Sequence, residues 1–111
     1  MTEHRFFCDM SRLTAADRVR LHEIARQIAD ARPSVAELAH GYAFTFASDR
    51  ATYQLVVEWL GYERLCCGFL EIQITSTADA GPIVVALTGA AGAKEVLREE
   101  FAGLLGHTSR A

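Results

Sequence analysis

Two adjacent cysteines, Cys66 and Cys67, are the residues whose chemistry ordinary core packing does not require. Glu63 precedes them by about one helical turn in the run Glu-Arg-Leu-Cys-Cys-Gly-Phe. Positions i, i+3 and i+4 share one face of a helix, so this run would place a carboxylate beside two soft sulfur atoms. A carboxylate near a buried surface must be paired, protonated or bound to a metal. The spacing therefore predicts a candidate cation site.

The predicted position of the pair, in the last turn of a helix, limits its chemistry. The negative end of the helix dipole opposes ionisation of a thiol, so an unassisted reactive thiolate is not favoured. A soft cation stabilises thiolates directly, and mercury(II), copper(I) and arsenic(III) suit two or three of them. Adjacent cysteines do not match the C-x-x-C spacing of structural zinc sites or redox motifs. Zinc would need histidine ligands, for which His4 and His40 are the candidates.

Cys8 is the remaining cysteine, and it would supply a third sulfur if folding brought it to the same face. Its aromatic neighbours, Phe6 and Phe7, favour a buried core thiol instead. The same alternative holds for Cys66 and Cys67, which could be small core residues where a helix turns into a strand. An odd cysteine count argues against a closed disulfide framework, so we expect thiols or ligands.

Composition excludes several classes of function. The 111 residues suffice for a single domain, residues 1–111, with a core of its own. A net charge of -3 argues against a nucleic-acid partner bound through its phosphates. The apolar runs are too short for a membrane span and the N-terminus lacks a signal-like hydrophobic stretch, so we expect a cytoplasmic location. The glycine spacing in residues 89–94 does not fit a P-loop, and we expect no nucleotide or organic cofactor.

The elements that must position these residues follow from periodicity. Thr14 with Asp17 predicts the start of a helix over about residues 15–31, which Pro33 ends. Residues 35–38 and 42–47 flank a turn and predict a hairpin. Its first arm has an alternative, a helical turn.

The second half repeats this pattern. Ser48 or Asp49 caps a second helix that ends near Gly68 and carries the cysteine pair in its last turn. Residues 70–75 and 83–87 predict a second hairpin. A third helix follows, with an apolar stripe formed by Val96, Leu97, Phe101, Leu104 and Leu105.

These elements define the expected fold. It is an α+β, two-layer sandwich with an antiparallel sheet of about four strands and three helices, in the order helix-hairpin-helix-hairpin-helix. The helices would cover one face of the sheet. An apolar outer face would need a partner, so a homodimer is plausible.

Several motifs together resemble an uncharacterised family of small bacterial proteins. They are residues 8–11 (Cys-Asp-Met-Ser), 41–44 (Gly-Tyr-Ala-Phe), 63–70, 87–89 and 92–95. The family has Cys-Asp-Leu-Ser near its start and Glu-Arg-x-Cys-Cys-Pro-Phe at a helix end, and no established activity comes with it. Some members resemble neighbours of heavy-metal resistance genes, and this association makes Cys8, Cys66 and Cys67 ligand candidates. The family has proline where this sequence has Gly68, and glycine would make the backbone after the helix more flexible.

The sequence thus favours a small cytosolic protein that binds a soft metal ion or metalloid through Cys66 and Cys67, with Cys8 as a third ligand. Glu63 would orient the ligands or balance charge. We assign no catalytic residue, and the partner is the metal ion. Two alternatives stay open. One is a thiol redox or detoxification enzyme in which one cysteine attacks and another resolves. The other is a dimeric interaction protein whose cysteines are only structural.

Overall fold

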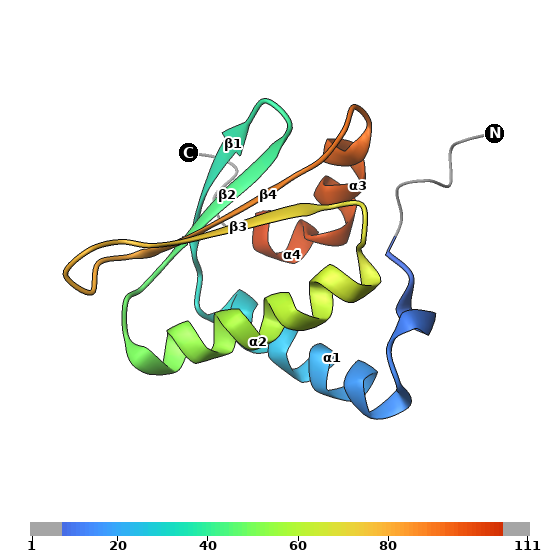
Figure 1. The fold of residues 1–111 in the computed structure, drawn as a ribbon, viewed down its shortest axis with the longest axis horizontal. Helices are drawn as coiled ribbons and strands as arrows, with labels where there is room; N and C mark the ends of the chain where they lie inside the picture. Colours follow the sequence, from blue (N-terminus) through green and yellow to red (C-terminus); the bar gives the residue numbers. More distant parts are fainter. Residues whose placement is uncertain (1–7, 106–111) are drawn as a thin grey trace.

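Two long helices carry the predicted site, α1 (Ala15–Asp30) and α2 (Arg50–Cys66). The computed structural model describes residues 8–105, and Figure 1 shows α1 and α2 packed together below the sheet. Thr14 caps α1 by accepting a hydrogen bond from the Asp17 amide at 3.0 Å. The Asp49 carboxylate caps α2 by accepting from the Thr52 amide at 3.0 Å. These side chains satisfy amides that the first helical turn leaves free, as the sequence predicted.

Four antiparallel strands form one sheet. They are β1 (Ser34–Leu38), β2 (Gly41–Phe46), β3 (Glu71–Ser76) and β4 (Ile83–Thr88), in the order β1-β2-β4-β3. Both predicted hairpins are confirmed, and the first arm is a strand rather than a helical turn. Strands β2 and β4 pair at the centre, where a Cβ on Gly41 would lie 1.9 Å from the Leu87 carbonyl oxygen. Only glycine fits that close approach.

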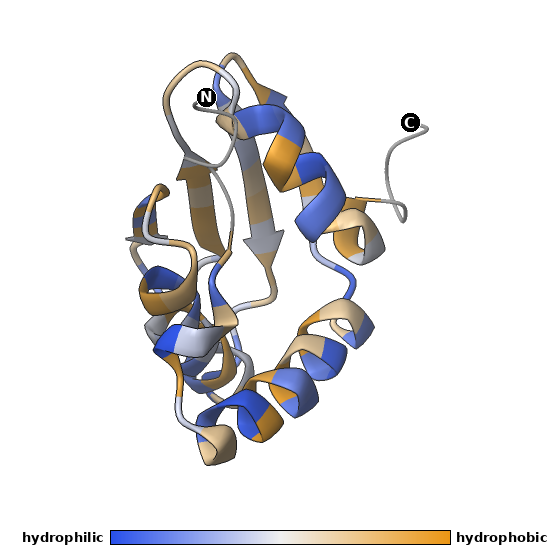
Figure 2. Ribbon diagram, turned by 90° about the vertical axis from the view of Figure 1, so that its right-hand side faces the viewer, coloured by the Kyte–Doolittle hydropathy of each residue, from blue (hydrophilic) through white to orange (hydrophobic). Residues whose placement is uncertain are grey.

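One face of the sheet forms the core with the helices. Alternate residues of the two central strands point inward and are buried: Tyr42, Phe44, Phe46, Ile83, Val85 and Leu87. Figure 2 shows apolar and polar segments alternating along the helices, as expected for helices that bury one side. The opposite face carries small, partly exposed residues such as Ala43, Thr45 and Ala86. The homodimer stays a prediction, because this face mixes apolar and polar side chains.

The predicted three-helix arrangement is wrong in its last element. Residues 8–105 contain four α-helices, and α3 (Ala93–Glu100) and α4 (Ala102–Leu105) replace the single third helix. The chain leaves helical geometry at Phe101, with φ of -113° and ψ of 29°, and the break lets Phe101 join the core. A short 3-10 helix, η1 (Met10–Arg12), precedes α1. Among the described residues, no helix has the length and apolar character needed to cross a membrane.

Candidate functional site

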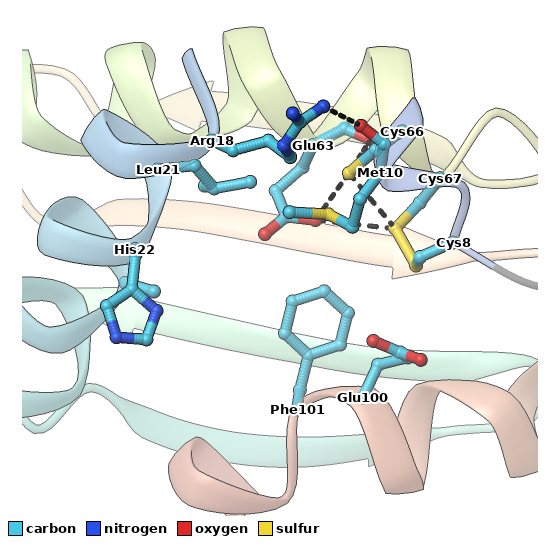
Figure 3. Close-up of a pocket in the computed structure, with 11 residues that line it drawn as sticks. Cys8, Met10, Arg18, Leu21, His22, Glu63, Cys66, Cys67, Glu100 and Phe101 are labelled. Carbon is cyan, nitrogen blue, oxygen red and sulfur yellow. Dashed lines mark hydrogen bonds between the residues drawn. A yellow bond between two sulfur atoms is a disulfide. The ribbon is translucent and has the colours of Figure 1, made fainter. Parts of the chain in front are cut away.

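The three cysteines of the chain meet at the C-terminal end of α2 (Figure 3). Cys66 is the last residue of α2, and Cys67 follows as its C-cap, with its amide donating to the Glu63 carbonyl at 2.7 Å. The segment before η1 packs against this end, where the Asp9 amide donates to the Cys66 carbonyl at 2.6 Å. This contact brings Cys8 onto the face that carries the cysteine pair. The three sulfur atoms come from two segments far apart in the sequence.

A disulfide joins Cys8 to Cys67, and this corrects the expectation that all three cysteines are free thiols or ligands. The odd count still leaves one thiol, that of Cys66, which is buried. Its sulfur lies 3.8 Å from the Cys67 sulfur. The sequence could not reveal the pairing, since the two bonded residues are separated by 59 positions. In this oxidised form, Cys8 and Cys67 have no thiolate to offer a metal.

Glu63 is buried beside the sulfur atoms, with 8% of its surface exposed. Trp59 Nε1 donates to Glu63 Oε2 at 2.9 Å, while Oε1 lies 3.4 Å from Cys67 Sγ and 3.9 Å from Cys66 Sγ. The disulfide sulfur of Cys67 carries no proton, so it can only accept from a protonated Glu63. Burial raises the pKa of Glu63 to about 7, although the Trp59 hydrogen bond opposes the shift. Burial therefore favours the protonated form of Glu63 up to a higher pH than for an exposed glutamate.

The Cys66 thiol is held in its neutral form. Burial, and then the negative charge of Glu63, raise the pKa of Cys66 to about 11. This result agrees with the expectation of an unreactive thiol, although burial rather than the helix dipole is the main cause. Cys66 therefore needs a bound cation, or a change in its surroundings, before it becomes a thiolate at neutral pH.

Glu63, Cys66 and Cys67 lie close enough together that they could hold a metal ion. Their nearest oxygen and sulfur atoms all lie within 4.8 Å of one another, and all three residues are buried. The predicted grouping on one helix face is therefore correct. In the oxidised form Cys67 has no thiol, and reduction of the disulfide would release the thiols of both Cys67 and Cys8. One carboxylate and two or three thiolates would suit a soft ion.

A cavity of about 200 Å³ lies against this group. Its lining combines the three cysteines and Glu63 with Met10, Arg18, Leu21, His22, Ala25, Glu100 and Phe101. Sequence reasoning missed the last seven residues as part of a site. His22 is exposed, and the helical spacing that places it on the same side of α1 as Ala25 brings it to the cavity edge. Of the two histidines considered for zinc, His40 lies in the turn between β1 and β2, and His4 lies outside the described residues.

Comparisons of the chain with protein-family models, with curated proteins and with solved structures gave no match. The resemblance to the family with a Glu-Arg-x-Cys-Cys-x-Phe motif rests on the motifs alone and stays a prediction. The site is therefore interpreted from its own geometry and chemistry.

Proposed function

We propose that the reduced protein binds one soft metal ion or metalloid through Cys66 and Cys67, with Cys8 as a third sulfur ligand. The observation that carries this proposal is the meeting of all three cysteines beside Glu63. Within residues 8–105, Glu63 is the only charged side chain that is buried. The three cysteine thiols and the Glu63 carboxyl group lie together, and each of them is costly to bury as an anion. A bound cation would stabilise the anionic form of all four groups.

The ligand set favours a thiophilic ion over a hard one. Magnesium and calcium prefer oxygen ligands, and this site offers a single carboxylate. A soft ion displaces the thiol proton of Cys66, whose high pKa then no longer prevents thiolate formation. Glu63 would balance the remaining charge or hold a proton, depending on the charge of the ion. Mercury(II), copper(I) and arsenic(III) are the ions with suitable softness and low coordination numbers.

The disulfide makes binding depend on redox state. The oxidised protein presents one thiol, whereas reduction by two electrons supplies two more. Cys66 and Cys67 have sulfur atoms 3.8 Å apart, and two metal–sulfur bonds of about 2.3 Å can span that separation. A soft ion should therefore bind the reduced protein in a one-to-one complex and bind the oxidised protein much more weakly.

The test is titration with mercury(II), copper(I) and arsenite, followed by native mass spectrometry of the reduced and oxidised protein. Cys8→Ser, Cys66→Ser and Cys67→Ser are then compared in the reduced state. We expect one ion per reduced chain, with loss of tight binding in Cys66→Ser and Cys67→Ser. Unchanged uptake in Cys8→Ser would remove Cys8 from the ligand set. No uptake by the reduced parent would refute the metal site and favour purely structural cysteines.

A thiol redox enzyme is the second candidate, and the Cys66 thiol beside the Cys8–Cys67 disulfide favours it. In such an enzyme, Cys66 or an external thiolate would attack the disulfide and a second cysteine would leave. The raised pKa of Cys66 argues against fast attack by that residue at neutral pH. Rapid alkylation of the reduced protein at pH 7, together with catalytic reduction of a small disulfide, would support the enzyme over the metal-binding protein.

A further inference from the structure

The cavity beside the sulfur atoms has an apolar interior and a polar edge. Leu21 and Phe101 line it and are buried, and Figure 3 shows Phe101 projecting from the α3–α4 junction across from the cysteines. His22 and Glu100 also line it but are exposed, so their polar groups lie at its edge. Met10, with 41% of its surface exposed, marks where the lining reaches solvent. Sulfur ligands and hydrophobic walls therefore share one space.

One nitrogen of the Arg18 guanidinium group, Nη1, hydrogen-bonds to the backbone. It donates to the Leu13 carbonyl at 2.8 Å and to the Met10 carbonyl at 3.3 Å. These bonds hold the segment that follows Cys8. The lining of the cavity therefore combines sulfur atoms and hydrocarbon with the carboxyl groups of Glu63 and Glu100 and the imidazole of His22.

The volume of the cavity exceeds what a bare ion needs. An ion bound by thiolates occupies the space between the sulfur atoms, whereas this cavity adds about 200 Å³ beside them. An apolar cavity of about 150 Å³ is large enough to hold benzene. The space next to the cysteines therefore matches a group of about the size of a phenyl ring.

We propose that the ligand of this site is a soft ion that carries one small organic group, with the cavity holding that group against Leu21, Ala25 and Phe101. This inference rests on the proposed function, since the cysteines must bind the ion. It narrows the ligand class from bare ions to organometallic or organometalloid compounds with one apolar substituent. The sulfur atoms bind the ion. Burial of the hydrocarbon makes an ion that carries an organic group bind more tightly than a bare ion.

A monosubstituted arsenic(III) oxide illustrates the balanced reaction. Two thiols of the reduced site each form a sulfur–arsenic bond, and the arsenic–oxygen bond breaks. The two thiol protons leave with that oxygen as water. Arsenic stays trivalent and keeps its bond to carbon, so binding needs no oxidant or reductant once the disulfide has been reduced.

The test compares methylarsine oxide with phenylarsine oxide, because both take two thiolates and differ only in the organic group. Their dissociation constants are measured by calorimetry on protein reduced with a phosphine, which is then removed without air. We expect the phenyl compound to bind about tenfold more tightly or better, from burial of the larger apolar group. A naphthyl compound, too large for the cavity, should lose this advantage.

Ala25→Leu is designed to fill the cavity, and Ala16→Leu is its matched control. Both alanines are exposed residues of α1, but only Ala25 lines the cavity. Leucine is a good helix former, so both variants should fold. We expect Ala25→Leu to remove most of the preference for phenyl over methyl and Ala16→Leu to keep it. Arsenite should bind the parent and both variants within about twofold, because it has no hydrocarbon to bury.

The outcomes separate this inference from the proposed function. Equal affinity of the parent for the methyl and phenyl compounds, with arsenite still bound, would overturn the cavity inference and leave the metal site intact. A phenyl preference that survives in Ala25→Leu would also overturn the assignment to this cavity. Failure of arsenite and both organic compounds to bind the reduced parent would overturn both. The parent comparison needs no variant, so it decides the inference even if Ala25→Leu does not fold.

Discussion

Burial of Glu63 should make the protein less stable as pH rises, and Glu63→Gln should remove that effect. The pKa of Glu63 is about 7 in the folded protein against 4.5 for an unperturbed glutamate. A pKa raised by folding gives stability that is complete below the unfolded value and is lost as pH rises through the folded value. Between pH 5 and pH 8 the loss amounts to about 2 to 3 kcal/mol for this one carboxyl group.

The assay is urea denaturation of the oxidised protein at pH 5 and pH 8, so that the disulfide is the same in every sample. Glutamine keeps an oxygen that can accept from Trp59 but has no charge to bury. The free energy of unfolding should therefore fall with pH in the parent by about 2 to 3 kcal/mol more than in Glu63→Gln. Glu58→Gln is the matched control, because Glu58 lies on α2 in a partly exposed ion pair with Arg20 and the pKa of Glu58 is lowered. A lowered pKa places its titration below pH 5.

The refuting result is an equal change in unfolding free energy between pH 5 and pH 8 for the parent and Glu63→Gln. Glu63 would then be ionised in the folded protein throughout this range, in contact with a group that stabilises its charge. An equally large effect of Glu58→Gln would instead show that the change reflects general surface charge.

Other predictions concern the surroundings of the site and the fold. Trp59→Phe removes the hydrogen bond to buried Glu63 and should lower the unfolding free energy by about 2 kcal/mol in urea denaturation. In the folded oxidised protein, Cys66 should react with iodoacetamide at pH 7.5 much more slowly than in urea; equal rates followed by mass spectrometry would contradict its burial. Gly41→Ala should destabilise the protein by at least about 2 kcal/mol, because a Cβ at this position collides with β4. Gly61→Ala, in an open position on α2, should stabilise the protein by up to about 1 kcal/mol. The shift of the denaturation midpoint measures each effect. Reduction of the disulfide should cost about 4 kcal/mol in denaturation experiments, and a bound soft ion should restore part of that loss.

The parts of this protein that its sequence predicts are those fixed by local periodicity. Tyr42, Phe44 and Phe46 alternate with smaller residues, and this pattern alone identifies the inward face of β2. Glu63, Cys66 and Cys67 share a face for an equally local reason, the spacing of an α-helix. Both inferences can be made without information on what packs against β2 or α2.

Contacts between distant segments are what the sequence leaves undetermined. The disulfide depends on the segment before η1 returning to the end of α2, and no periodic pattern marks that return. The cavity also depends on such contacts, since Met10, His22 and Phe101 come from three separate segments of the chain. The break at Phe101 is a tertiary effect as well: the apolar stripe continues in sequence, but a straight helix is given up so that Phe101 and Leu104 reach the core. Packing overrides the local helical preference there.

The position of the disulfide connects these features. It ties the N-terminal segment to the end of α2 and, when it is reduced, the backbone bond from Asp9 to Cys66 and the bonds from Arg18 can still hold that segment in place. Cys8 would then stay near Cys66 and Cys67 as a third thiol instead of moving into solvent. Holding ligands close before an ion arrives lowers the entropy cost of binding. The contacts that allow the disulfide to form would thus also preorganise the reduced site. The redox state would then decide whether Cys8 and Cys67 form a disulfide or bind a soft ion together with Cys66.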